Sequence, residues 1–564
     1  MEGRQRHSSG FAFLVAAGIL LSRVAGLIRE RAFAYYFGGT SMAAGVFRAG
    51  LRIPNFLQNL FGEGVLSASF IPVYARLLAQ GDEELAGRVA GAIASILAVF
   101  VSISVLLGMI LTPLIVDLIV PGFKGEARQL TIQVVRILFP GVGVLVLSAW
   151  CLGILNSHRK FFISYVAPVL WNTAMIATMV ALGTRLSQVS LAVALAWGTV
   201  AGSFLQFAVQ LPFVFRYARG IRFAIQTSLP PVKTVIRTTG PAVLGRGVVQ
   251  ISAYVDQLIA SYLQNGAGAV SVLGYAQTIY LLPISLFGMS VAAAELPQMS
   301  SAIGTREEIT ATLRRRLTAG IRQVAFFIIP TVVGFLLIGR MLVGALYQTG
   351  HFGRADSTYV AYVLAGSTIG MLAVTRGRIY NSAFYALHDT TTPLRFAAVR
   401  VALTAALGYL FAFPLRPFIA WVISGLLQLP APRPEDAALV FGAVGLTSSA
   451  GIAGWIEYLL LRAAMEKRIG KVRIEPTFYL KLWGPALAAG IVSLLGVHFA
   501  LPVLHGIAAV RSSLQPVIDG VGALGVFGAI YLSGTLFLGI EETRRLLRRR
   551  AGMTNPGAGT SNPE

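Results

Sequence analysis

Arginine, asparagine and glutamate side chains occur at helical spacing inside a long apolar stretch, residues 42–78. At 100° per residue, one stripe of a helix would hold Arg48, Arg52, Asn55, Asn59 and Glu63. A charge at membrane depth costs roughly 3 kcal/mol, so these side chains are expected to face protein or water rather than lipid. Guanidinium forks fit phosphate oxygens, and the stripe therefore predicts a binding site for a phosphate-bearing anion.

Two further apolar stretches carry charges of the same kind. Residues 10–37 contain Arg23, Arg29, Glu30 and Arg31. Residues 234–263 contain Arg246, Gln250, Asp256 and Gln257. Several charges on adjacent helices predict an interior polar cavity with a positive excess, which suits an anion.

Structural explanations compete with ligand binding at several of these positions. Arg29 and Arg31 could form a juxtamembrane cluster in a different helix register. Glu63, which glycines flank, could only cap a broken helix. Asp256 is open between two interpretations, a cation ligand and an ion-pair partner of Arg246.

The composition indicates a polytopic membrane protein. Of the 564 residues, 55% are hydrophobic and only 12% are charged, whereas a soluble protein has near a quarter of its residues charged. The net charge of +23 does not indicate nucleic-acid binding, because the basic residues gather in short loops rather than in a stripe on a soluble fold. A single cysteine, Cys151, excludes a disulfide or a thiolate metal site within the chain.

The elements that must position these side chains are about fourteen membrane-spanning helices, because the apolar blocks are roughly 20 residues long or longer. We predict them at residues 10–37, 42–78, 86–119, 128–155, 161–183, 187–215, 234–263, 268–300, 317–347, 356–387, 393–414, 437–464, 477–500 and 515–541. Internal prolines make 42–78 and 268–300 the least regular of these spans. Residues 415–436 could contain a short interfacial segment.

Lysine and arginine gather in alternate loops, including "SHRK" at 157–160 and "MEKRIGKVR" at 465–473. This bias predicts a multi-pass protein of the plasma membrane with both termini in the cytoplasm.

A weak internal symmetry suggests two halves, since each half opens with a helix rich in small residues that carries intramembrane charge. We predict a cytoplasmic N-terminus (1–9), an N-lobe of six helices (10–223), a C-lobe of six helices (224–470), two further helices (471–550) and a disordered tail (551–564).

Enzyme motifs are not found in the sequence. There is no P-loop, no HExxH pair and no aspartate-rich motif in a cytoplasmic loop. Without an ATP site, a transport function would have to run on an ion gradient, on the membrane potential, or downhill.

Several motifs closely resemble the MurJ (MviN) family of lipid II flippases. They are "SRVAGLIRERAFAYYFGG", "RIPNFLQNLFGEGVLSASFIPVY", "VPGF", "LNSHRKFFISYVAPVLWN", "GPAVLGRGVVQIS", "ELPQMS", "LYQTGHF" and "FYALHDTTTP". They follow the family's order from about residue 20 to residue 395. This family belongs to a wider exporter superfamily of drug/cation antiporters and polysaccharide-lipid flippases.

The resemblance implies an all-α fold of two six-helix lobes in a V arrangement, with two C-terminal helices forming a lipid-open groove. It implies a monomeric transporter, not an enzyme, that moves undecaprenyl-pyrophosphate-linked peptidoglycan precursor from the inner to the outer leaflet by alternating access. No cofactor is implied, although a sodium ion or the membrane potential could drive transport.

The resemblance also implies roles for particular residues. Arg23, Arg29 and Arg52 match arginines that act on the pyrophosphate, and Glu30 and Glu63 match the family's acidic positions. Asp256 matches a position that contributes to a sodium site in some relatives.

Three positions depart from the family pattern. Gly45 stands where an acid is usual, and Gln58 and Thr278 stand where arginines are usual. Arg48 and Arg246 are additional arginines that could restore the positive charge from new positions. Two alternatives stay open, a flippase for another polyprenyl-linked saccharide and a divergent cell-wall scaffold that does not transport.

Overall fold

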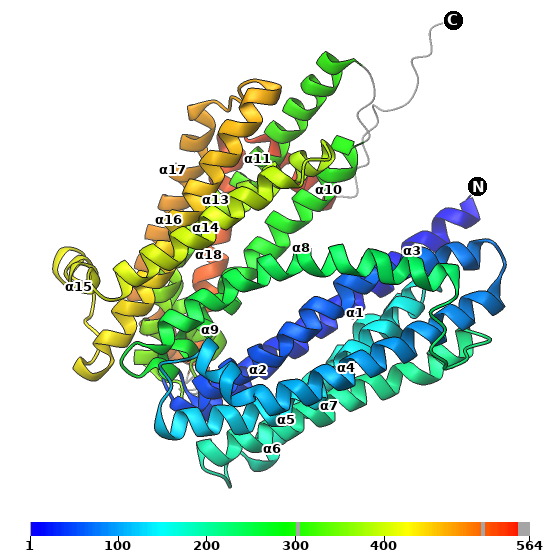
Figure 1. Cartoon of the computed structure of the whole chain (residues 1–564). Coiled ribbons are helices and arrows are strands. Elements are labelled where there is room, and N and C mark those ends of the chain that lie inside the picture. The colour runs from blue at the N-terminus through cyan, green and yellow to red at the C-terminus, as the bar shows by residue number, and fades with distance from the viewer. Residues whose placement is uncertain (1, 301–304, 509–513, 551–564) are drawn as a thin grey trace, which may run out of the picture. The chain divides into compact units, whose positions relative to one another are not determined.

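The computed structural model describes residues 2–300, 305–508 and 514–550, and Figure 1 shows that helices form almost all of this part of the chain. The α-helices are α1 (Glu2–Phe37), α2 (Met42–Phe61), α3 (Glu63–Ala79), α4 (Glu83–Ile119), α5 (Gly125–Ser157), α6 (Phe161–Leu182), α7 (Gln188–Tyr217), α8 (Pro230–Ser261), α9 (Gly266–Pro283), α10 (Ser290–Ser300), α11 (Arg306–Leu337), α12 (Gly339–Tyr347), α13 (Arg354–Ala386), α14 (Thr391–Ala412), α15 (Arg416–Ala420), α16 (Pro434–Ile469), α17 (Pro476–Ala508), α18 (Gln515–Phe537) and α19 (Glu541–Arg550). Two π-helices, Ile284–Met289 and Trp421–Leu426, complete the list.

Every predicted span coincides with one or more of these helices, so the all-α membrane fold is confirmed. Within the described residues, eleven helices are long and apolar enough to cross a membrane. The helices α1, α2, α3 and α8 are not among the eleven, and all four carry charges that the sequence analysis singled out. The total of fourteen spans therefore stays a prediction.

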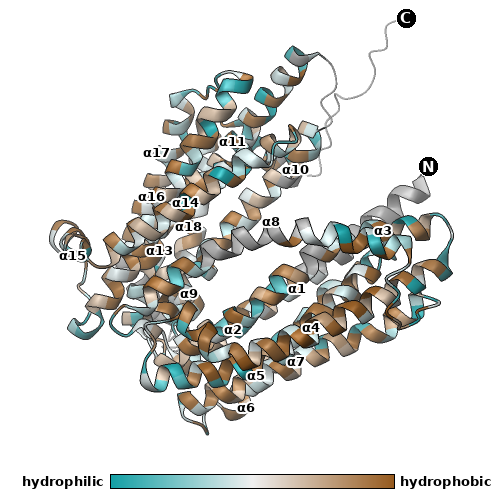
Figure 2. Ribbon diagram, in the orientation of Figure 1, coloured by the Kyte–Doolittle hydropathy of each residue, from teal (hydrophilic) through white to brown (hydrophobic). Residues whose placement is uncertain are grey.

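The surface of α4 shows why such helices need lipid around them. Leu106, Ile110, Leu114 and Leu118 follow one another at intervals of four residues, and each is at least 60% exposed. An apolar stripe of this kind is stable only against an apolar environment. In Figure 2 hydrophobic residues dominate the length of α4, whereas hydrophilic residues cluster in loops and at helix ends.

The described chain divides into two compact units. The first contains residues up to Gly274 together with Thr349–Asp356 and Ala431–Gly442, and the second contains the remaining residues. The first unit is built around α5, which packs on α2, α4 and α7. One of its cores is centred on Phe70, Tyr74 and Trp150, whose side chains are almost fully buried.

The second unit has a core of its own. Helices α11, α17 and α18 pack together there, and they bury Phe326, Leu482 and Tyr531 among other side chains. The Tyr531 hydroxyl donates to the backbone oxygen of Phe326 at 2.6 Å, so the polar end of this buried ring has an acceptor.

The two irregular spans predicted from internal prolines are both interrupted. The span at 42–78 is two helices, α2 and α3, which meet at Gly62. The expectation that Glu63 continues the stripe of Arg48 and Arg52 is therefore wrong, because Glu63 begins a new helix. The span at 268–300 changes to a π-helix directly after Pro283, a residue that cannot donate a backbone hydrogen bond.

Candidate functional site

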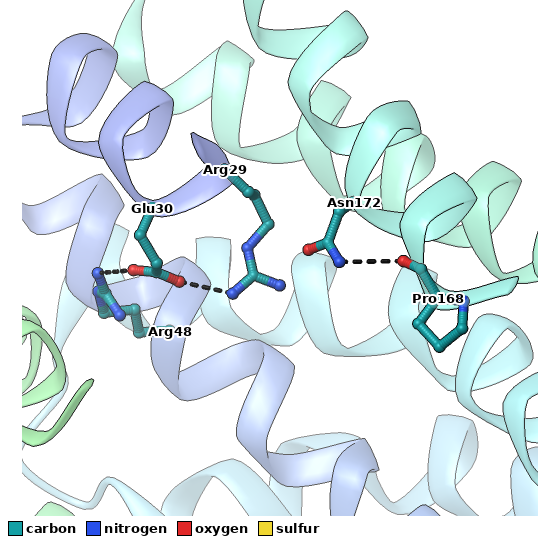
Figure 3. Close-up of polar contacts among 5 residues, drawn as sticks. All are labelled: Arg29, Glu30, Arg48, Pro168 and Asn172. Carbon is teal, nitrogen blue, oxygen red and sulfur yellow. Dashed lines mark hydrogen bonds and ion pairs between the residues drawn. The ribbon is translucent and has the colours of Figure 1, made fainter. Parts of the chain in front are cut away.

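Glu30 is the centre of a buried cluster of charges in the first unit. Its Oε1 accepts from Arg29 Nη2 at 2.7 Å, and its Oε2 accepts from Arg48 Nη2 at 2.8 Å. The three side chains are between 12% and 20% exposed. Figure 3 shows the carboxylate between the two guanidinium groups, which come from α1 and α2. Two positive charges share one negative charge, and the cluster keeps a positive excess.

Aromatic rings hold both arginines in place. The Arg29 guanidinium lies 5.1 Å from the centre of the Trp171 ring of α6, and that of Arg48 lies 4.9 Å from the centre of the Phe33 ring. A guanidinium over a ring face gains cation–π attraction without using its N–H groups. The rings therefore position both guanidinium groups without occupying their N–H donors.

A glycine on α9 makes room for Arg48. A Cβ atom at Gly274 would lie 2.7 Å from Arg48 Cδ, so the arginine stem passes directly over this backbone. Gly274 precedes Thr278, where the family usually has an arginine, by one helical turn. The structure thus places the additional arginine beside the same helix.

The departure at Gly45 also has a structural cause. A Cβ atom at this position would lie 1.7 Å from the backbone oxygen of Ala267, at the beginning of α9. Real Cβ atoms do not approach this closely, so the acidic side chain that the resemblance implies at this position does not fit here.

Arg52 faces a different helix from Arg48. Its guanidinium lies 5.6 Å from the centre of the Tyr254 ring of α8. The Tyr254 hydroxyl donates to the backbone oxygen of Arg52 at 2.9 Å. Asp256, two residues after Tyr254 on α8, acts electrostatically on Arg52. The structure thus relates Asp256 to Arg52, while its pairing with Arg246, whose side chain lies outside the described residues, and cation binding by Asp256 both stay predictions.

The remaining predicted residues lie in varied surroundings. Asn55 is half-buried, and its Oδ1 has no hydrogen-bond partner among the described residues. Asn59 and Arg23 are exposed. The side chains of Glu63 and Arg246 lie outside the described residues. Of the predicted set, the structure therefore brings together Arg29, Glu30 and Arg48.

Sequence analysis missed the neutral partners of these charges. Trp171, Phe33 and Tyr254 were not predicted as site residues, although the quoted motif ending in "VLWN" contains Trp171. Asn172 follows in the same motif, and its Nδ2 donates to the backbone oxygen of Pro168 at 3.0 Å. In Figure 3 Asn172 lies on the other side of Arg29 from Glu30. The motif was the available signal, because periodicity does not identify a ring that stacks on an arginine.

Comparisons with known proteins point to one family. The family described as "Lipid II flippase MurJ" matches residues 33–431. A lipid II flippase MurJ of Burkholderia cenocepacia is 29% identical, and the match covers 96% of this chain and 99% of that protein. A probable lipid II flippase MurJ of Haemophilus influenzae is 30% identical over 84% of this chain and 89% of that protein.

Solved structures show the same fold. A structure titled "Lipid II flippase MurJ, inward closed conformation" matches with a TM-score of 0.68 at 21% identity, covering 96% of this chain and 100% of that one. An inward-facing multidrug resistance MATE family transporter of the MOP superfamily matches with a TM-score of 0.59 at 18% identity, covering 81% of this chain and 99% of that one.

Proposed function

Because the chain belongs to the MurJ family of lipid II flippases, we propose that it carries lipid II from the cytoplasmic to the outer leaflet of the bacterial inner membrane. The observation that carries the proposal is the cluster of Arg29, Glu30 and Arg48 in a chain of this family. The protein is a multi-pass membrane transporter and not an enzyme.

The pyrophosphate of the substrate is the group that this cluster would recognise. Guanidinium groups bind phosphate oxygens through paired N–H donors, and such charge-assisted hydrogen bonds are about twice as strong as neutral ones. Glu30 has two roles in this scheme. It lowers the cost of burying two arginines, and it holds them within reach of one ligand.

Arg52 would add a further positive charge from the same helix as Arg48. Its place against Tyr254 directs it toward α8 rather than toward Glu30. Arg48 would supply the charge that the family usually obtains from an arginine at position 278. Under this proposal the site recognises the pyrophosphate, and other surfaces of the protein contact the sugar and the peptide.

Transport would follow from exchange between inward-open and outward-open states. The substrate can shift this balance only through a difference in its affinity for the two states. The membrane potential contributes about 2.3 kcal/mol per charge per 100 mV, and an interior-negative potential favours outward movement of an anion. Both chain ends would lie in the cytoplasm, as the lysine and arginine bias of the loops predicts.

Complementation tests the proposal. A host is depleted of its own lipid II flippase, this chain is expressed, and growth and outer-leaflet precursor are measured. We expect rescue by the wild-type chain and no rescue by Arg29→Ala. Arg185→Ala, which removes an exposed arginine from the loop between α6 and α7, is the matched control and should rescue. Failure of the wild-type chain to restore outer-leaflet precursor, despite normal membrane expression, would contradict the proposed function.

A further inference from the structure

Arg376 of α13, in the second unit, is a buried cation outside the site described above. The residue is only 7% exposed. Its guanidinium lies 5.0 Å from the centre of the Tyr479 ring of α17. Its Nε and Nη2 are buried, and neither has a hydrogen-bond partner among the described residues. Two strong donors thus lack an acceptor in the part of the chain that the structure describes.

Two other arginines of the second unit each have a carboxylate partner. Glu542 accepts from Arg322 at 3.0 Å, and Glu466 accepts from Arg462 at 2.8 Å. The Tyr479 hydroxyl is within electrostatic reach of three arginines, Arg322, Arg376 and Arg462. No ion pair joins Arg376 to a carboxylate in the described part of the chain. Of these three arginines, Arg376 is the one without an ion pair among the described residues.

An uncompensated buried charge is costly, and an anion that supplies the missing acceptors would lower that cost. A tetrahedral oxyanion suits the geometry, because the Nε and Nη2 edge of a guanidinium can donate two parallel hydrogen bonds to two oxygens. We propose that Arg376 and Tyr479 form a second anion site, which binds a phosphate group independently of the Arg29–Glu30–Arg48 cluster.

The depth of Arg376 allows two sources of phosphate. Helix α13 has 33 residues and is about 50 Å long, so about 10 Å of it extends beyond each side of a hydrocarbon core about 30 Å thick if the helix is centred. Arg376 is ten residues, or about 15 Å, from the end at Ala386. Its guanidinium lies against Tyr479, which is in the first turn of α17 (Pro476–Ala508), and a helix end of this kind is expected near the headgroup layer. The phosphate could belong to a phospholipid headgroup or be free inorganic phosphate.

Phosphate-dependent stabilisation of the purified full-length protein tests this site. The thermal unfolding midpoint is followed during titration with sodium phosphate, with sodium chloride at matched ionic strength as the reference. In a second arm, phosphatidylglycerol and phosphatidylcholine are titrated separately into the detergent. We expect a shift with sodium phosphate if the source is free phosphate, and with phosphatidylglycerol alone if the source is a lipid.

Two variants assign the shift to the site. Arg376→Gln should weaken the apparent affinity at least tenfold, whereas Arg395→Gln, at an exposed arginine of α14, should leave it unchanged. If Arg376→Gln cannot be purified, Tyr479→Leu keeps the charge, removes the stacking ring, and should weaken the affinity severalfold. The proposal is overturned if neither probe shifts the wild-type midpoint, or if the variants respond as the wild type does.

The result is separable from the proposed function. If the wild-type protein shows no phosphate effect but rescues the flippase-depleted host, only the second anion site is contradicted. If it shows the phosphate effect but does not rescue the host, only the flippase assignment is contradicted.

Discussion

In the first unit one carboxylate, Glu30, pairs with two arginines, whereas in the second unit Glu542 and Glu466 each pair with one arginine and Arg376 has no ion pair among the described residues. Both regions end with one positive charge in excess. The excess is shared between two side chains around Glu30, but it is confined to one side chain at Arg376. An arginine with little exposure can thus be stabilised by a shared acid or by an aromatic ring. We expect substitutions at these two kinds of site to have different effects on stability.

The largest effect is expected from Glu30→Gln. The change leaves Arg29 and Arg48 close together without a negative charge, and breaking a buried ion pair costs about 3 kcal/mol or more. The thermal unfolding midpoint of the purified protein should fall strongly, and rescue of a flippase-depleted host should be lost. The double variant Glu30→Gln/Arg48→Gln should recover part of the stability, because it removes the repulsion. A double variant no more stable than the single one would show that Glu30 does not bridge the two arginines.

The next effect concerns Gly45. Alanine or aspartate at this position meets the Ala267 backbone oxygen, and such overpacking costs about 2 kcal/mol. The control is Gly26→Ala in α1, where a Cβ atom has nothing within 4 Å and where alanine is the better helix former. We expect a lower unfolding midpoint for both Gly45 variants and no decrease for Gly26→Ala. Full activity of Gly45→Asp, with unchanged stability, would contradict the close approach of α2 and α9.

A smaller effect on stability is expected from replacing arginines of the second unit. It should differ between Arg322, which has a carboxylate partner, and Arg376, which has none among the described residues. Arg322 and Arg376 stack on the adjacent rings of Phe478 and Tyr479. Arg322→Gln leaves the buried Glu542 without its partner and should cost about 1–3 kcal/mol. Arg376→Gln removes an uncompensated charge and should leave stability unchanged or increase it in phosphate-free buffer with a neutral detergent. Equal losses in the two unfolding midpoints would indicate that both arginines are compensated by the protein.

The smallest effect is at the loop residue Asp389. Hydrogen bonds from the backbone and hydroxyl of Thr392, together with Arg468, lower the pKa of this carboxyl to about 2. Because the folded-state pKa lies below the unfolded value near 3.9, the stabilisation is fully present above about pH 4 and is lost as the pH falls toward 2. The difference in unfolding midpoint between wild type and Asp389→Asn should therefore be small, constant from pH 5 to 7, and reduced near pH 3. A difference that grows on acidification would contradict this sign.

The fold was largely predictable from the sequence, because apolar blocks of membrane length determine helices with little help from tertiary structure. The breaks at Gly62 and after Pro283 were only partly predictable. Internal prolines predicted that both spans are irregular. Whether the backbone ends one helix and begins another at such a position depends on tertiary packing. This is why Glu63 was placed on the wrong helix.

The candidate site was predictable as a set of charges and not as a set of contacts. Arginine in an apolar helix is expected to face protein or water, and this argument found Arg29, Arg48 and Arg52, as well as Arg23, which is exposed. It could not show that Glu30 accepts from both Arg29 and Arg48, because that pairing depends on how α1 and α2 pack. The need for glycine at position 45 could not be predicted either. The close contact is with the backbone of Ala267, which is more than two hundred residues away in the sequence.

Binding of a polyprenyl pyrophosphate to the purified protein tests the central claim most directly. Undecaprenyl pyrophosphate in detergent serves as the probe, and its apparent affinity is compared among the wild type, Arg29→Gln/Arg48→Gln and the exposed control Arg395→Gln. The Glu30-centred cluster predicts at least a tenfold loss for the double variant and no change for the control. Equal affinity in all three proteins would contradict recognition of the diphosphate by these arginines.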